Sequence, residues 1–260
     1  MKDDSGFDGA VAALVAAGYS LLSPTQFSRV VGVPLSDLNA LSGSWTGLPP
    51  DEYLRDGGHY RSRRHSCFVQ ELMRQGGLRG DSAQAPATAP QDALRQVDHR
   101  AHWQPTTYNA LHGGIERWFE PVEPRVATAS AWLNVVTALG RLFHRARAAD
   151  RWHIEAHQFR IDTANGIGRP TPEGAHRDGV DFVAVILVNR QQVRGGETRV
   201  FDAHGTSGQR FTMADPWSAL LMDDAKVIHE TTPIQPDGGV GVRDTLVLTY
   251  RAGGFQSQEK

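Results

Sequence analysis

Two histidines and one aspartate are the residues of this sequence best suited to bind a catalytic metal. His176 and Asp178 lie two positions apart, and His229 follows much later in the chain. Residues two apart on a β-strand point to the same face, so His176 and Asp178 can bind one ion together. Two histidines and a carboxylate form the facial triad that holds non-haem Fe(II) and leaves coordination positions open. We therefore expect His176, Asp178 and His229 to be metal ligands and catalytic residues.

An arginine and a threonine follow the last expected ligand. Arg243 and Thr245 are also two apart, so both would face the same way on a strand. A guanidinium group grips a carboxylate through two parallel hydrogen bonds, and a neighbouring hydroxyl can donate another. This pair suits the distal carboxylate of a dicarboxylate co-substrate. The alternative for Arg243 is a surface ion pair with Asp244 or another neighbour.

A histidine two residues before an acid is weak evidence by itself. With 11 histidines and 29 acids in 260 residues, chance gives roughly one such pair, and the chain has two. For the first, His153 with Glu155, no turn lies nearby, and we expect no metal there. The second contains the expected ligands, follows a proline- and glycine-rich turn, and precedes an apolar run at 182–188. That context predicts a site at the mouth of a barrel.

Hydrophobic periodicity and turn residues predict the elements that must position these side chains. Apolar residues at intervals of three and four indicate helices, and short apolar or alternating runs indicate strands. We expect helices at 11–17, 24–31, 35–41 and 126–148, and strands at 19–22, 153–163, 182–188, 198–201, 219–222, 226–229 and 245–250. Helices first and strands later predict a mainly β, α+β protein with a jelly-roll, cupin-like core and a helical buttress.

We expect one domain over residues 1–260. Residues 1–150 would be largely helical and loop support, and residues 151–255 would form the core with the metal site. The segment 80–91 is rich in alanine, proline and small polar residues, so we expect a loop there. It would be either a lid over a ligand or a plain surface loop.

Composition excludes several classes of function. The net charge of −2 gives no electrostatic case for binding nucleic acid or an anionic membrane. Cys67 is the only cysteine, so intrachain disulfides and zinc sites built from several thiolates are excluded. The first residues carry acids, unlike a secretory signal, and the apolar stretch at 10–17 is too short to span a bilayer. We expect a soluble, cytoplasmic protein of undetermined oligomeric state. The basic cluster at 61–64 suits a surface turn or a functional site equally.

The motifs together resemble the Fe(II)/2-oxoglutarate-dependent dioxygenases. More narrowly, the chain resembles the bacterial 2OG-Fe dioxygenase family that includes L-isoleucine 4-hydroxylase and related free-amino-acid hydroxylases. The likeness covers most of the chain beyond residue 50, and its most specific string is Pro172-Glu173-Gly174-Ala175-His176-Arg177-Asp178-Gly179. The other matching stretches are 57–65, 108–117, 157–160, 195–198 and 243–249.

The resemblance implies a double-stranded β-helix fold and dependence on Fe(II), 2-oxoglutarate and O2, with ascorbate as a reductant in vitro. It also implies hydroxylation of a free L-amino acid, or sulfoxidation of a thioether one, with release of succinate and CO2. Related halogenases lack the metal-binding carboxylate, so Asp178 favours oxygen transfer. Candidate substrate residues in the matching stretches are Arg64, His112, Gln158 and Arg160, of which Gln158 and Arg160 would share one strand face. Glu173 would either orient His176 or cap the turn.

Three alternatives stay open at this point. A cupin-like metalloenzyme could use the same ligands without 2-oxoglutarate, but it would not need Arg243 and Thr245. A jelly-roll binding module without enzymatic activity would not need the triad. A dioxygenase could instead act on a peptide or a modified amino acid, which a shallow open groove beside the metal would favour over a closed pocket.

Overall fold

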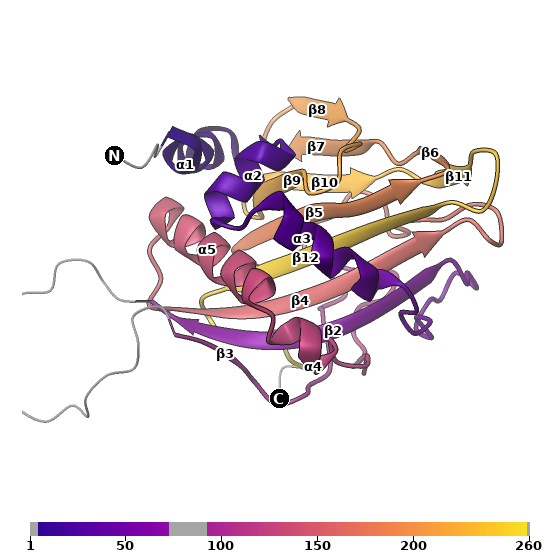
Figure 1. The fold of residues 1–260 in the computed structure, drawn as a ribbon, viewed down its shortest axis with the longest axis horizontal. Coiled ribbons are helices and arrows are strands. Elements are labelled where there is room, and N and C mark those ends of the chain that lie inside the picture. Colours follow the sequence, from indigo (N-terminus) through magenta and orange to yellow (C-terminus); the bar gives the residue numbers. More distant parts are fainter. Residues whose placement is uncertain (1–4, 73–92, 259–260) are drawn as a thin grey trace, which may run out of the picture.

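The computed structural model describes residues 5–72 and 93–258, which form a helical layer and three β-sheets (Figure 1). The helices are α1 (Ser5–Ala17), α2 (Pro24–Val31), α3 (Leu35–Leu41), the short 3-10 helix η1 (Ser42–Trp45), α4 (Pro124–Ala127) and α5 (Ser130–Ala146). The strands are β1 (Tyr19–Leu22), β2 (Arg61–Glu71), β3 (Leu94–Gln96), β4 (Arg151–Asp162), β5 (Phe182–Gln191), β6 (Val193–Gly195), β7 (Thr198–Asp202), β8 (Gly208–Phe211), β9 (Ala219–Asp223), β10 (Val227–Thr231), β11 (Ile234–Pro236) and β12 (Val242–Arg251). The expected mainly β fold with a helical buttress is confirmed.

Local signals set the ends of the helices. α2 begins with a capping box, in which the Ser23 hydroxyl accepts from the Gln26 backbone and the Gln26 side chain accepts from the Ser23 backbone. It ends at Gly32, whose positive φ of 66° suits glycine. The single helix expected at 126–148 is instead two, α4 and α5. Thr128 Oγ1 donates to the carbonyl of Pro124, and Ala129 takes an extended conformation that ends α4.

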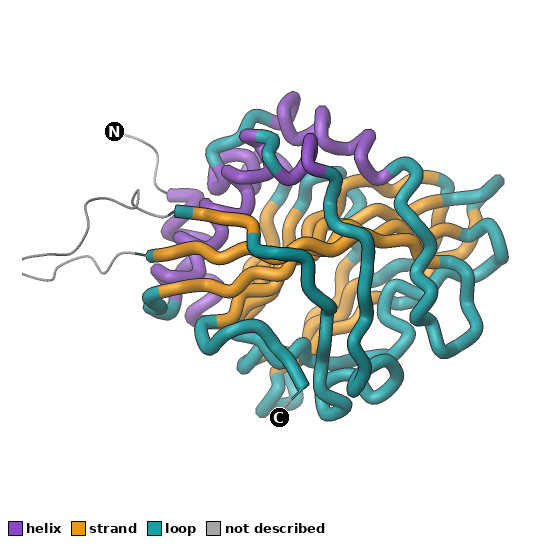
Figure 2. Tube along the Cα trace, turned by 90° about the horizontal axis from the view of Figure 1, so that it is seen from below, coloured by secondary structure: helices purple, strands orange, loops and turns teal. Residues whose placement is uncertain are grey.

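The largest sheet has seven strands in the order β1-β9-β5-β12-β4-β2-β3. Every pairing within it is antiparallel. The helices cover one face of this sheet, as Figures 1 and 2 show from two directions. Even-numbered residues of β2, β4 and β12, and of β5 up to the bulge that follows Leu187, point to that helical layer. Ile154, Ala156, Ala184 and Leu248 are examples, and all four are fully buried in the main hydrophobic core.

Odd-numbered residues of the same strands point to the opposite face, because side chains alternate along a strand. A second hydrophobic cluster joins that face to the small sheet β10-β7-β8. Val183 and Leu187 of the large sheet pack there with Val200 and Val227 of the small one. A two-stranded sheet, β11-β6, completes this side. The expected jelly-roll core is therefore present as facing sheets that do not close into one barrel.

The basic cluster at 61–64 suited a surface turn or a functional site equally. The structure places it at the start of β2, whose eleven residues pair with β4 throughout. Its cavity-facing side is polar, so it lacks the apolar alternation by which strands are predicted. The division at residue 150 is too sharp, since β1, β2 and β3 all precede it and belong to the large sheet.

The expected loop at 80–91 lies outside the described residues. No helix in the described ranges has the length and apolar character needed to cross a membrane.

Candidate active site

The odd-numbered face of β4, β12 and β2 forms the floor of a polar cavity. Pairing places Arg243 beside Ile161, which lies beside Arg61, and Thr245 beside Phe159, which lies beside Arg63. The segment 102–117 and the turn at 170–178 form other walls. The described lining comprises Arg61, Arg63, His102, Gln104, Asn109, His112, Arg117, Glu155, His157, Phe159, Ile161, Pro170, Thr171, Glu173, His176, Asp178, Val180, Val185, His229, Thr231, Arg243, Thr245, Val247, Thr249 and Gln256.

The three expected metal ligands meet in this cavity. His176 Nε2 lies 3.8 Å from one oxygen of Asp178, and His229 Nε2 lies 3.7 Å from the other. One ligand atom from each residue falls within 4.8 Å of the others. Reciprocal backbone hydrogen bonds of 3.0 Å between His176 and His229 hold the turn against β10. Two imidazoles and a carboxylate at this spacing can occupy one face of a divalent ion.

Both histidines can offer a ring nitrogen to a metal. His176 Nδ1 donates to the carbonyl of Gly174 at 2.9 Å, which leaves Nε2 as the atom that would bind the ion. Burial opposes a charge on this imidazole, but the Asp178 and Glu173 carboxylates outweigh burial and raise the pKa of His176, so a bound metal would displace a proton there. Burial and the nearby His176 lower the pKa of His229 to about 3, so its imidazole is neutral. His229 Nδ1 is buried without a hydrogen-bond partner among the described residues. The donor set therefore fits a transition metal of the Fe(II) type.

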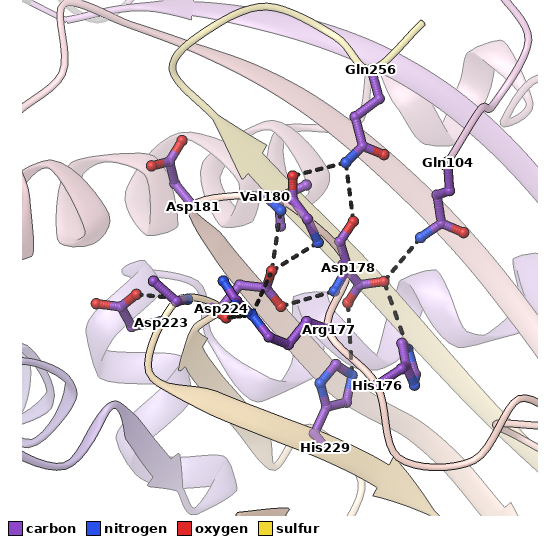
Figure 3. Close-up of polar contacts among 12 residues, drawn as sticks. Gln104, His176, Arg177, Asp178, Val180, Asp181, Asp223, Asp224, His229 and Gln256 are labelled. Carbon is purple, nitrogen blue, oxygen red and sulfur yellow. Dashed lines mark hydrogen bonds and ion pairs between the residues drawn. The ribbon is translucent and has the colours of Figure 1, made fainter. Parts of the chain in front are cut away.

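The Asp224 side chain anchors the backbone that carries the expected ligand Asp178 (Figure 3). Its carboxylate accepts hydrogen bonds from the backbone N–H groups of Asp178, Gly179 and Val180 at 2.9, 2.8 and 3.2 Å. Asp224 is 1% exposed, so these bonds lie away from bulk water. Gly179 has a positive φ of 76°, and a Cβ there would meet the Tyr108 ring at 2.4 Å. Asp224 thus fixes the backbone that carries Asp178, a role that the sequence did not reveal.

Two glutamines complete the support of Asp178. Gln104 Nε2 donates to Asp178 Oδ1 at 3.2 Å, and Gln104 Oε1 accepts from Arg117 Nη2 at 3.0 Å. Gln256 Nε2 donates to the backbone carbonyls of Asp178 and Gly179 at 3.1 and 2.8 Å. Gln104 therefore joins the expected metal ligand to a cavity arginine in one chain of hydrogen bonds.

Arg243 and Thr245 both line the cavity and are buried. Asp244 does not pair with Arg243, because it faces the helical side and accepts from Arg160 at 2.7 and 2.8 Å. That contact rules out the alternative ion pair between Arg243 and Asp244. Arg243 Nε and Nη2 are buried without hydrogen-bond partners among the described residues. A buried guanidinium with free donors fits an incoming carboxylate, such as that of 2-oxoglutarate.

Of the four expected substrate residues, only His112 lines the cavity. Arg64 binds Glu120 and the carbonyl of Pro121, Gln158 binds Ser44, and Arg160 binds Asp244. Gln158 and Arg160 do share one strand face, but it is the helical face, as it is for Arg64. Because Arg64, Gln158 and Arg160 lie at even positions, their side chains point away from the cavity and do not line it. The expected assignment of Arg64, Gln158 and Arg160 is therefore corrected.

The cavity contains four charged residues besides the expected ones, of which Arg61 and Arg63 belong to the basic cluster left open in the sequence, and Arg117 and Glu155 had no assigned role. Arg61, Arg63 and Glu155 lie at odd positions of β2 and β4, and Arg117 comes from the facing segment. All four are buried. The available signal was the two-residue spacing of Arg61 and Arg63 and of Glu155, His157 and Phe159. The first pair indicates a shared face only once β2 is known to be a strand.

Glu155 is the centre of a second polar cluster. His102 Nδ1 and His65 Nε2 lie 2.5 and 3.0 Å from Glu155 Oε2, and His157 Nε2 lies 3.6 Å from it. Arg63 Nη2 donates to His157 Nδ1 at 2.7 Å. Because a guanidinium cannot accept, Nδ1 must be the acceptor and Nε2 carries the proton toward Glu155. The cluster has the composition of a metal site, but its protons are arranged to stabilise a buried carboxylate.

The electrostatics of this cluster agree with that arrangement. Burial opposes ionisation of Glu155, but His102 and His65 hold its pKa below the usual range. Burial lowers the pKa of His102 to about 3 and lowers those of His65 and His157, so all three are neutral donors. Glu155 therefore does not act with His153, its partner in the sequence pattern, which instead contacts the Arg251 carbonyl.

The sequence matches the 2OG-Fe dioxygenase family over residues 42–249. The chain belongs to the 2OG-Fe dioxygenase family. A bsmA homologue from Methylobium petroleophilum PM1 is 52% identical, with 98% of this chain and 96% of that chain covered and a TM-score of 0.87. No match was found among curated proteins.

Two more distant structures share the fold. IDO from Bacillus thuringiensis is 17% identical, with 95% and 96% of the two chains covered and a TM-score of 0.71. The Fe(II)/(alpha)ketoglutarate-dependent dioxygenase TqaL is 16% identical, with 100% and 97% covered and a TM-score of 0.66. The protein is thus a 2-oxoglutarate-dependent non-haem iron dioxygenase that uses Fe(II), 2-oxoglutarate and O2. This excludes the alternatives without 2-oxoglutarate. The narrower likeness to L-isoleucine 4-hydroxylase stays a prediction.

Proposed function

We propose that this dioxygenase hydroxylates a free L-amino acid. His176, Asp178 and His229 would hold Fe(II), and Arg243 with Thr245 would bind the distal carboxylate of 2-oxoglutarate. The chain would act as a single domain. The observation that carries the proposal is the cavity beside the triad, whose charged walls are themselves buried. Arg63 and Arg117 are 3% and 2% exposed, which suits a small polar molecule enclosed on several sides.

Iron(II) with 2-oxoglutarate and O2 supplies the oxidation, which adds one oxygen atom to the substrate and releases succinate and CO2. The residues of the chain position the reactants. Arg243 and Thr245 orient the co-substrate from β12. Gln104 and Asp224 keep the Asp178 carboxylate directed at the ion. A peptide substrate is the second candidate, and it would need an open groove rather than buried walls.

The Asp51 carboxylate and two aromatic rings hold part of the cavity wall rigid. Arg61 Nε donates to Asp51 at 2.7 Å, and Arg63 lies 3.7 Å from the same oxygen. The Arg63 guanidinium lies over Phe119 and Phe159, 3.8 and 4.3 Å from the ring centroids. These contacts favour a preorganised pocket that selects a substrate by shape and charge.

The decisive experiment measures oxygen incorporation into each proteinogenic L-amino acid. The protein is supplied with Fe(II), ascorbate and 2-oxoglutarate, and products are read by mass spectrometry beside succinate release. We expect one amino acid to gain a single oxygen with matched succinate. Succinate release with no oxidised amino acid, together with oxidation of peptides or modified amino acids, would refute the proposed substrate class.

A further inference from the structure

One cavity arginine lacks the carboxylate that its neighbours have. Arg61 and Arg63 both face Asp51. Arg117 has no carboxylate within ion-pair distance among the described residues, and its only hydrogen bond from a terminal nitrogen goes to the neutral amide of Gln104. Arg117 Nε is buried without a partner. Burial lowers the pKa of Arg117 to about 10, which still leaves the guanidinium charged near neutral pH.

One cavity carboxylate lacks donors in the same way. Glu173 lines the cavity, its side chain is 13% exposed, and Oε2 is buried without a partner among the described residues. Oε1 lies 3.5 Å from His176 Nε2, the nitrogen that would bind the metal and would then have no proton to donate. Glu173 is also outside the group of ligand atoms that lie within 4.8 Å of one another. A carboxylate with one buried, unpaired oxygen is stabilised by a cationic partner that donates to it.

The buried positive and negative charges around the substrate part of the cavity are equal in number. Arg243 and Asp178 are set aside because they are assigned to 2-oxoglutarate and the metal. The other cations are then Arg61, Arg63 and Arg117, and the other anions are Asp51, Glu155 and Glu173. The cluster histidines are neutral for the reasons given above. A substrate with a net charge would leave one buried charge uncompensated, which is costly. A substrate with two opposite charges would satisfy both Arg117 and Glu173.

Both groups lie beside the metal triad. Arg117 is joined through Gln104 to Asp178, and Glu173 is next to His176. Arg117 and Glu173 also lie within electrostatic range of each other. This arrangement would hold the charged end of a small molecule near the ion and direct the rest of it along the cavity.

We propose that Arg117 binds the carboxylate of the substrate and Glu173 binds its ammonium group, so that the cavity selects free zwitterionic α-amino acids. This assignment rests on the proposed function and extends it to named residues. It gives Glu173 a role different from those expected from the sequence, since the Gly174 carbonyl already orients His176.

The test compares the best amino acid substrate with the carboxylic acid of the same carbon skeleton that lacks the amino group. In Glu173→Gln, kcat/KM for the amino acid should fall about ten- to hundredfold, because a charged hydrogen bond is lost. The deaminated acid should be affected far less, so the preference for the amino acid falls at least about tenfold. In Arg117→Gln both compounds should lose activity by similar factors, and the preference should persist. Glu116→Gln changes an exposed neighbour outside the cavity lining and should leave both unchanged.

The KM for 2-oxoglutarate and the iron content should stay near wild type in Glu173→Gln, which separates substrate recognition from a damaged metal site. An unchanged preference in Glu173→Gln would overturn the assignment of Glu173. Full activity on the amino acid in Arg117→Gln would overturn that of Arg117, whether or not the first variant folds. If wild type oxidises no free amino acid, the proposed function and this inference both fail. If it does and the preference survives in Glu173→Gln, only the inference fails.

Discussion

The buried histidine cluster around Glu155 predicts a loss of stability in mild acid. His102 is neutral in the folded protein, with a pKa lowered by burial to about 3. An unfolded histidine titrates near 6.5, so below that pH the unfolded state binds a proton that the folded state does not. A depressed folded pKa therefore gives stability that is present above pH 6.5 and is lost as pH falls toward the folded value.

The magnitude follows from linkage. Between about pH 7.5 and about pH 5.5, the unfolded His102 gains nearly a full proton, and the free energy of unfolding falls by about 1.4 kcal/mol from this residue alone. The lowered pKa values of His65 and His157 act in the same direction. Asp224 acts in the opposite direction, because burial raises its pKa to about 6. A comparison between variants is needed to isolate the cluster.

The assay is urea unfolding of wild type and His102→Asn at both pH values, with metal removed by the same chelator. An asparagine amide can replace His102 Nδ1–H as a donor but does not titrate. Wild type should lose about 1.4 kcal/mol more than His102→Asn on acidification. His204→Asn, at an exposed position, serves as the control and should retain the wild-type dependence. Equal losses in wild type and His102→Asn would refute the neutral, buried state of His102.

Three further substitutions test the metal and co-substrate sites. Arg243→Ala should raise the KM for 2-oxoglutarate about 30- to 150-fold and barely change that for the organic substrate, since about 2–3 kcal/mol of charge-assisted hydrogen bonding is lost. Equal increases in the two KM values would contradict its role. His229→Ala should abolish succinate release while circular dichroism shows a folded protein, and near-normal turnover would contradict its assignment as a ligand. Asp224→Ala should weaken Fe(II) binding about ten- to hundredfold in an equilibrium titration, because three backbone N–H groups lose their acceptor. Unchanged affinity would show that the turn holds its shape without Asp224.

The sequence predicted the elements whose signals are local. Glycine and proline marked the ends of α1 and α2, and apolar runs marked β5, β9 and β12. The two-residue spacing of His176 and Asp178 indicated a shared orientation, which holds although His176 forms only an isolated bridge and Asp178 lies in neither a helix nor a strand. These features depend on residues close together in the chain.

The features that the sequence did not predict depend on pairing between segments that are far apart in the chain. β2 escaped prediction because its cavity side carries Arg61 and Arg63, and charged residues do not produce an apolar alternation. Gln158 and Arg160 were assigned to the wrong face because strand periodicity groups residues without saying which group faces the ligand. Glu155 was set aside because its histidine partners come from β2, from the segment near 102 and from its own strand. No spacing in the sequence links those three places.

The alternation of faces in β2 and β4 has a consequence for how this protein can change. Along one strand, odd positions such as Glu155, His157 and Phe159 face the substrate cavity, whereas Ile154 and Ala156 face the hydrophobic core. Specificity and stability are thus encoded by interleaved residues that can vary separately by substitution. They cannot vary separately by insertion or deletion, because a shift of one residue would exchange the two sets. New substrates in related enzymes should therefore arise from substitutions at odd positions, with strand lengths held constant.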